Sequence, residues 1–85
     1  MTDSIQITMI CFAGLKEKVG SGRISLTIPV NSTCTEFISQ LVASYPQTQV
    51  YSSCLLVARN GNYLNETDII QDQDELACFP PVSGG

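Results

Sequence analysis

The sequence has no histidine and no tryptophan, and its 85 residues include four lysine and arginine residues against eight aspartate and glutamate residues. Without histidine, the chain lacks the side chain that most often acts as a general base. The four basic residues are scattered, so no basic stripe with interleaved aromatic side chains follows a phosphate backbone, and we expect no nucleic-acid partner. The net charge of -4 favours a protein partner with a basic groove.

The signatures of several other function classes are missing too. The sequence contains no G-x-x-x-x-G-K-[ST] phosphate loop and no G-x-G-x-x-G motif. No apolar run approaches the ~18 residues of a membrane span. The first residues, MTDSIQITMI, lack the basic region of a signal peptide. We therefore expect no membrane partner, a cytoplasmic location and no catalytic side chains of the chain's own.

Four cysteines, Cys11, Cys34, Cys54 and Cys78, are spaced too widely for a metal site. They are 23, 20 and 24 positions apart and form no C-x-x-C pair, so we expect no metal. Each lies on or beside an apolar stretch, which favours reduced cysteines that pack as small apolar side chains. A redox or sulfur-relay role stays open for Cys78, because it lies close to the C-terminal segment.

Alternating apolar residues predict five strands in one small domain, residues 1–79, followed by a tail at 80–85. The Asn60-Gly61 pair is a preferred two-residue hairpin turn and connects the third and fourth strands. The expected strands are residues 4–12, 23–30, 54–59, 62–64 and 75–79. The residues expected to point inward are Ile5, Ile7, Met9, Cys11, Ile24, Leu26, Ile28, Val30, Leu76 and Cys78.

One amphipathic helix is predicted after residue 33. The sequence TCTE at 33–36 is a capping box, in which Thr33 and Glu36 each accept a backbone N–H of the other residue. Apolar residues then recur at helical spacing until Pro46 ends the helix. We expect a single turn of helix within 13–22 and an irregular connection at 46–53. One helix on one face of a five-stranded sheet gives a two-layer α+β fold.

The segment before the last strand, residues 65–74, is predicted to be an acidic loop in which Ile69 and Ile70 point inward. Its carboxylates lack the spacing and the glycine of a calcium-binding EF-hand loop, which favours a solvated loop, with a docking surface as the alternative. The clustered carboxylates are Asp68, Asp72, Asp74 and Glu75.

Three aromatic residues, Phe12, Tyr63 and Phe79, are candidates for a partner interface. If the first and last strands are neighbours, these side chains share an exposed face with Ile10 and Ala77, as interaction surfaces do. The alternative is that the 13–22 loop half covers this face and the side chains merely pack.

The tail is the strongest candidate for a functional site. Its two prolines end the last strand and hold the following residues extended, and its two glycines carry no side chain that would block entry into a narrow channel. The terminal carboxylate of Gly85 is then the reactive group. The tail residues are Pro80, Pro81, Val82, Ser83, Gly84 and Gly85.

Four segments resemble the family of molybdopterin synthase small subunits, which are sulfur carriers with a mixed five-stranded ubiquitin-like β-grasp fold. They are CFAGLKEKVG (11–20), TEFISQLVASYP (35–46), LLVARNGNYL (55–64) and DELACFPPVSGG (74–85). The resemblance implies that a ubiquitin-activating-like adenylyltransferase and sulfurtransferase uses ATP to adenylate Gly85 and converts it to a thiocarboxylate. No cofactor is permanently bound.

The resemblance further implies that the thiocarboxylate donates sulfur to cyclic pyranopterin monophosphate in the large subunit, within a heterotetramer. Molybdopterin, the precursor of the molybdenum cofactor, is the product. Phe12, Tyr63 and Phe79 stand where the family places apolar contacts to its partners. Two positions differ, because the family usually has glycine at Gln73, and often arginine at Lys16.

Three other functions remain open from the sequence. A carrier of the same kind can donate sulfur to thiazole synthesis or to tRNA thiolation. A ubiquitin-like modifier is joined through its terminal glycine, here Gly85, to a lysine of a target protein. A β-grasp binding module with a disordered tail is the simplest alternative, since one fold hosts all of these functions.

Overall fold

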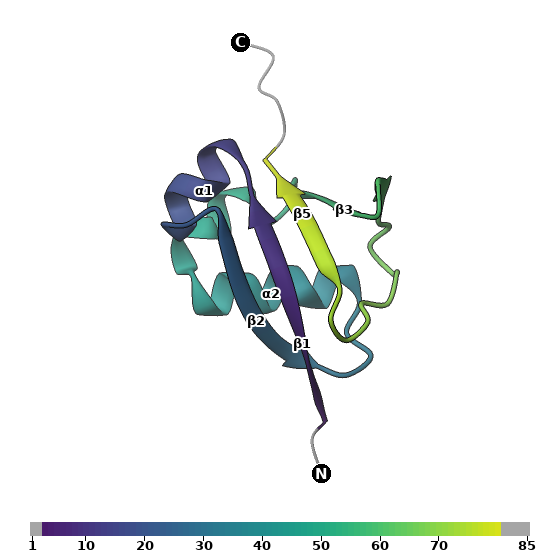
Figure 1. The fold of residues 1–85 in the computed structure, drawn as a ribbon. Coiled ribbons are helices and arrows are strands. Elements are labelled where there is room, and N and C mark those ends of the chain that lie inside the picture. The colour runs from purple at the N-terminus through teal and green to yellow at the C-terminus, as the bar shows by residue number, and fades with distance from the viewer. Residues whose placement is uncertain (1–2, 81–85) are drawn as a thin grey trace.

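The computed structural model describes residues 3–80, which form one sheet and helices on one of its faces (Figure 1). The predicted tail residues from Pro81 to Gly85 lie outside the described part. In chain order the elements are β1 (Ser4–Cys11), α1 (Ala13–Val19), β2 (Arg23–Pro29), α2 (Cys34–Ser44), the 3-10 helix η1 (Pro46–Tyr51), β3 (Leu56–Arg59), β4 (Asn62–Tyr63) and β5 (Glu75–Phe79).

The sheet has the strand order β2-β1-β5-β3-β4, with the first and last long strands side by side at its centre. β1 and β5 run parallel, whereas β1 pairs antiparallel with β2, and β3 pairs antiparallel with both β4 and β5. This mixed five-stranded sheet confirms the predicted α+β class. It also places the end of β5, from which the tail departs, beside the end of β1 (Figure 1).

The core lies between the sheet and the helices, and it uses the inward positions that the alternation predicts. Met9, Leu76 and Cys78 have no exposed surface, and Phe37 of α2 and Leu15 of α1 are equally buried in the same cluster. The capping box at the start of α2 is formed as predicted, with the Glu36 N–H donating to Thr33 Oγ1 at 3.2 Å.

Several predictions about the connections are wrong. Residues 13–19 form an α-helix of seven residues, longer than the single turn expected, which ends at Gly20 with a φ of 91°. The 46–53 connection contains the 3-10 helix η1, which Pro46 begins. Val30 was expected to point inward but is 46% exposed, because β2 ends at Pro29 and the chain turns at Asn31, where φ is 67°.

The strand predicted at 54–59 begins two residues later, at Leu56. Cys54 lies in the turn before it and is exposed, so this cysteine is not part of the core. In the acidic loop, Ile70 is 1% exposed and points inward as expected. Ile69 is 38% exposed, so the prediction that it points inward is wrong.

Candidate functional site: the bare face of the sheet and the base of the tail

One face of the sheet is covered by helices and the other is bare. Strand pairing places Ile10 beside Ala77, Ala77 beside Ala58, and Ala58 beside Tyr63 in one row across four strands. In the row nearer the tail, Leu56 lies opposite Phe79. We call these residues, with Phe12, the apolar face: Ile10, Phe12, Leu56, Ala58, Tyr63, Ala77 and Phe79.

Phe12 and Phe79 meet at the tail end of this face. Their rings are stacked with centroids 4.7 Å apart and an interplanar angle of 13°. The backbone N–H of Phe12 also donates to the carbonyl of Cys78 at 3.3 Å. The last residues of β5 are therefore held from the side, so Pro80 leaves the sheet from a fixed position. Tyr63 lines a shallow hollow together with Phe79 and Ala77.

The helices leave the apolar face uncovered. Leu15 of α1 packs in the same cluster as Phe37 and Leu41 of α2, so both helices lie on the opposite side of the sheet (Figure 1). On the bare side, Phe12 is 41% exposed and Tyr63 is 67% exposed. The 13–22 segment therefore leaves part of Phe12 and most of Tyr63 exposed. Whether the face binds a partner stays a prediction.

The sequence did not reveal two members of this face, Leu56 and Ala58. The stretch CLLVAR is apolar at nearly every position, so no alternation distinguishes its inward side from its outward side. In the structure Val57 is buried at 2% exposure, while Leu56 on the other side is 43% exposed. Leu56 could have been assigned to this face if the pairing of β3 with β5 had been known, because Leu56 lies opposite Phe79.

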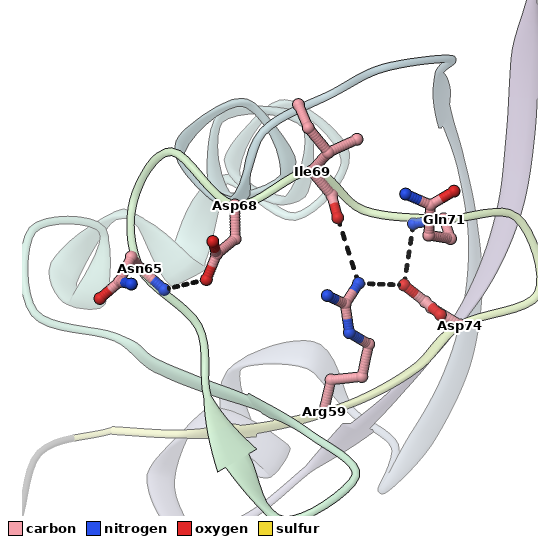
Figure 2. Close-up of polar contacts among 6 residues, drawn as sticks. All are labelled: Arg59, Asn65, Asp68, Ile69, Gln71 and Asp74. Atoms are coloured by element: carbon pink, nitrogen blue, oxygen red, sulfur yellow. Dashed lines mark hydrogen bonds and ion pairs between the residues drawn. The ribbon is translucent and has the colours of Figure 1, made fainter.

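The acidic loop is held by internal contacts (Figure 2). Arg59 Nη1 donates to Asp74 Oδ2 at 2.7 Å and to the Ile69 carbonyl at 3.1 Å, and the Gln71 N–H donates to the same Asp74 oxygen at 2.8 Å. Asp68 accepts the Asn65 N–H at 2.7 Å. These contacts fold the loop against β3.

The other two carboxylates of the cluster are also engaged. Asp72 accepts the Gln6 N–H at 2.9 Å, and Glu75 pairs with Arg23 at 3.0 Å. Because each of these four carboxylates has an intramolecular partner, this cluster holds the loop in place and is a poor docking surface. Within residues 3–80, no group of three or more cysteine or acidic side chains is arranged to hold a metal ion.

Three of the four cysteines are buried, and Cys78 is the most deeply placed. Burial raises the pKa of the Cys78 thiol far above its usual range, and the neighbouring thiols of Cys11 and Cys34 raise it further. A thiol that stays protonated and has no exposed surface cannot attack a sulfur donor. Cys78 therefore packs in the core, and its position does not favour a sulfur relay.

No helix in the described part of the chain has the length and apolar character needed to cross a membrane. Residues 9–85 match the ThiS family. The chain is 36% identical over 84 residues to a molybdopterin synthase sulfur carrier subunit from Arabidopsis thaliana, covering 99% of this chain and 88% of the relative. It is 38% identical over 85 residues to the protein of the same name from Dictyostelium discoideum, covering 96% and 99%.

Solved structures agree with this fold. The crystal structure of SAMP1 from Haloferax volcanii superimposes with a TM-score of 0.79 at 30% identity, covering 94% of this chain and 99% of that one. A ubiquitin-like β-grasp is therefore the fold. With a family match over most of its length and full-length relatives above 30% identity, this chain belongs to the ThiS family and groups with the sulfur carrier subunits of molybdopterin synthase.

Proposed function

We propose that this protein is the sulfur carrier subunit of molybdopterin synthase in the cytoplasm. The observation that carries the proposal is the similarity to proteins of that name over at least 96% of this chain. The geometry of the fold supports it. A central strand, β5, delivers the tail at one end of the sheet, beside an apolar face that no element of residues 3–80 covers.

The reactive group in this proposal is the Gly85 carboxylate. A carboxylate is a poor electrophile, so an adenylyltransferase partner first joins it to AMP from ATP and releases pyrophosphate. A persulfide then attacks the acyl carbon and displaces AMP, and a second thiol cleaves the sulfur–sulfur bond to leave a thiocarboxylate. The thiocarboxylate is the sulfur nucleophile that the large subunit uses on cyclic pyranopterin monophosphate.

The folded domain contributes position and no acid–base chemistry. The chain has no histidine, and burial raises the pKa values of the Cys11, Cys34 and Cys78 thiols. The catalytic side chains would belong to the large subunit, and the two proteins would form a heterotetramer with a carrier at each end. The apolar face would pack on the large subunit while the residues from Pro80 to Gly84 thread its channel.

The test is sulfur transfer in a reconstituted system with the adenylyltransferase, a persulfide donor, ATP and the large subunit. Intact-mass spectrometry should show an oxygen-to-sulfur exchange on the carrier, and molybdopterin should form from the precursor. Deletion of Gly84 and Gly85 should abolish both and leave the circular dichroism spectrum unchanged. Lys18→Ala, at an exposed position on α1, is the control and should retain both activities. If the truncated protein still supported molybdopterin formation, the proposal would be wrong.

A second candidate is a ubiquitin-like modifier, since a structure 30% identical to this chain is that of SAMP1, a small archaeal modifier protein. In that function the adenylated Gly85 is attacked by a lysine amine and an isopeptide bond forms. Covalent conjugates in the host that survive denaturing electrophoresis and lack the oxygen-to-sulfur exchange would favour the modifier over the carrier.

A further inference from the structure

A second apolar surface lies between α2 and β3, around the edge of the sheet from the apolar face. It is a groove of about 510 Å³. Its apolar lining includes Ile38 and Val42 on α2, Leu55 and Leu56 at the start of β3, and Leu64 directly after β4. None of these five side chains is fully buried, so the groove offers apolar contact area to another chain.

The edge of β3 along this groove is incompletely paired. The Leu64 N–H donates to the Val57 carbonyl at 2.8 Å, and there the pairing ends, because the Asn65 N–H turns to Asp68. Leu55 directly precedes β3, and the alternation of backbone direction along an extended chain places its N–H and carbonyl on the same edge as those of Val57. Within residues 3–80, the Leu55 N–H and carbonyl have no hydrogen-bond partner.

An unpaired backbone donor and acceptor beside an apolar groove fit an extended peptide that adds to the strand edge. The bound segment would pair with Leu55 and place alternate apolar side chains between Val42 and Leu64. At the mouth of the groove is Glu66, whose carboxylate has no ion-pair partner in the described residues. The segment should therefore also carry a lysine or arginine opposite Glu66.

The groove is continuous with the apolar face. Leu56 and Tyr63 belong to the apolar face and also line the groove, so a partner that covers one surface reaches the other around β3 and β4. We propose that the groove receives an extended, basic-flanked apolar segment of the same partner that packs on the apolar face. This inference rests on the proposed function, in which that partner is the large subunit of the synthase.

The first test measures amide exchange of the full chain, free and bound to the large subunit, by hydrogen–deuterium exchange with mass spectrometry. The unpaired Leu55 amide should exchange rapidly in the free protein and be slowed in the complex, together with the amides around Ala77. If the Ala77 region were slowed and Leu55 unchanged, the groove would be empty in the complex. Slowing of Leu55 in the chain alone at high concentration would instead indicate self-association and overturn the proposal.

The second test compares affinities by calorimetry for matched charge variants. Glu66→Lys, at an exposed position in the mouth of the groove, should weaken binding by about 10-fold or more. Asp3→Lys makes the same charge change at an exposed position that does not line the groove and should alter it by less than about 3-fold. Val42→Glu should weaken binding far more than Ala43→Glu on the same helix, with unchanged circular dichroism.

Ala77→Arg on the apolar face separates this inference from the proposed function. If Ala77→Arg abolished binding while Glu66→Lys and Val42→Glu had no effect, the groove inference would be wrong and the interface of the proposed function would stand. If none of the three variants weakened the complex, the proposed interface would fail together with the groove.

Discussion

The two ends of the sheet are held together by different interactions. At the loop end, where the acidic loop lies, backbone and carboxylate groups are paired within the chain. The loop also caps α2, because the Cys34 N–H donates to the Asp68 carbonyl at 2.9 Å. At the tail end, stacked rings and apolar packing hold Phe12, Phe79 and α1. The loop end therefore has few groups left for a partner, whereas the tail end exposes the apolar face beside the outgoing tail.

This difference assigns stability to one end and recognition to the other. Polar contacts that are satisfied internally add little to binding, while an exposed apolar surface gains free energy when a partner covers it. Mutations of the internally paired residues at the loop end should therefore lower the free energy of unfolding with little change in partner affinity. Mutations at the exposed part of the tail end should do the reverse.

The largest effect on stability is expected for Arg59→Met, which breaks the ion pair with Asp74. The two side chains are 25% and 17% exposed, so removal of the guanidinium leaves a partly buried carboxylate and the Ile69 carbonyl without their donor. The free energy of unfolding should fall by about 2 kcal/mol in urea denaturation. Arg23→Met removes the exposed pair with Glu75 and should cost less than about 0.5 kcal/mol. Equal costs for the two variants would contradict the assignment.

A smaller loss is expected for Gly14→Ala in α1 at the tail end. A methyl group at Gly14 would overlap the Tyr51 hydroxyl, so the Tyr51 side chain or the segments that carry the two residues must shift. The cost should be about 1–2 kcal/mol, in spite of the better helix propensity of alanine. Tyr51→Phe removes the obstructing oxygen, and in that background Gly14→Ala should be neutral or stabilising by up to about 1 kcal/mol. A cost that persists in the double variant would show that Tyr51 is not the cause.

Phe12→Ala should separate stability from recognition. Loss of the stacking with Phe79 should cost about 1 kcal/mol in stability, since Phe12 is 41% exposed. The affinity for the large subunit should fall by more than this cost predicts, because the variant also removes apolar area from the proposed interface. Phe12→Leu keeps an apolar side chain and should retain most of the affinity in calorimetric titrations. Unchanged affinity in Phe12→Ala would exclude this end of the face from the interface.

The sequence predicted the strands of the core well, because alternation over several residues records which side each residue faces. It failed at Val30, where the alternation of apolar residues continues past the end of β2, and at Ile69, which lies in a loop where no alternation distinguishes it from its neighbour Ile70. The apolar face was found in part, through Phe12 and Phe79, and Leu56 was missed because its neighbours are apolar on both sides. The groove along α2 could not be predicted, since it depends on where β4 stops pairing with β3.

The smallest change in stability is expected at Gln73, a strained residue at the loop end of the sheet. Gln73 has a φ of 69°, in the left-handed region that favours glycine, and the sequence resemblance had already marked this position as one where the family usually has glycine. The turn is kept because the Gln73 N–H donates to the Gln6 carbonyl at 2.7 Å, beside the bond from the Gln6 N–H to Asp72. The turn geometry is therefore reached without glycine, at a local cost.

Gln73→Gly should relieve that cost and stabilise the protein by about 0.5–1 kcal/mol. The left-handed conformation costs a residue with a Cβ about 1–2 kcal/mol, and the greater freedom of glycine in the unfolded chain cancels part of the gain. Gln73→Ala retains a Cβ and should be neutral within about 0.5 kcal/mol, which makes it the matched control. Urea denaturation measures both. Sulfur transfer should stay unchanged in Gln73→Gly, since the turn lies at the opposite end of β5 from the tail. A destabilising Gln73→Gly would mean that the Gln73 side chain, and not the backbone bond to Gln6, holds this end of the sheet together.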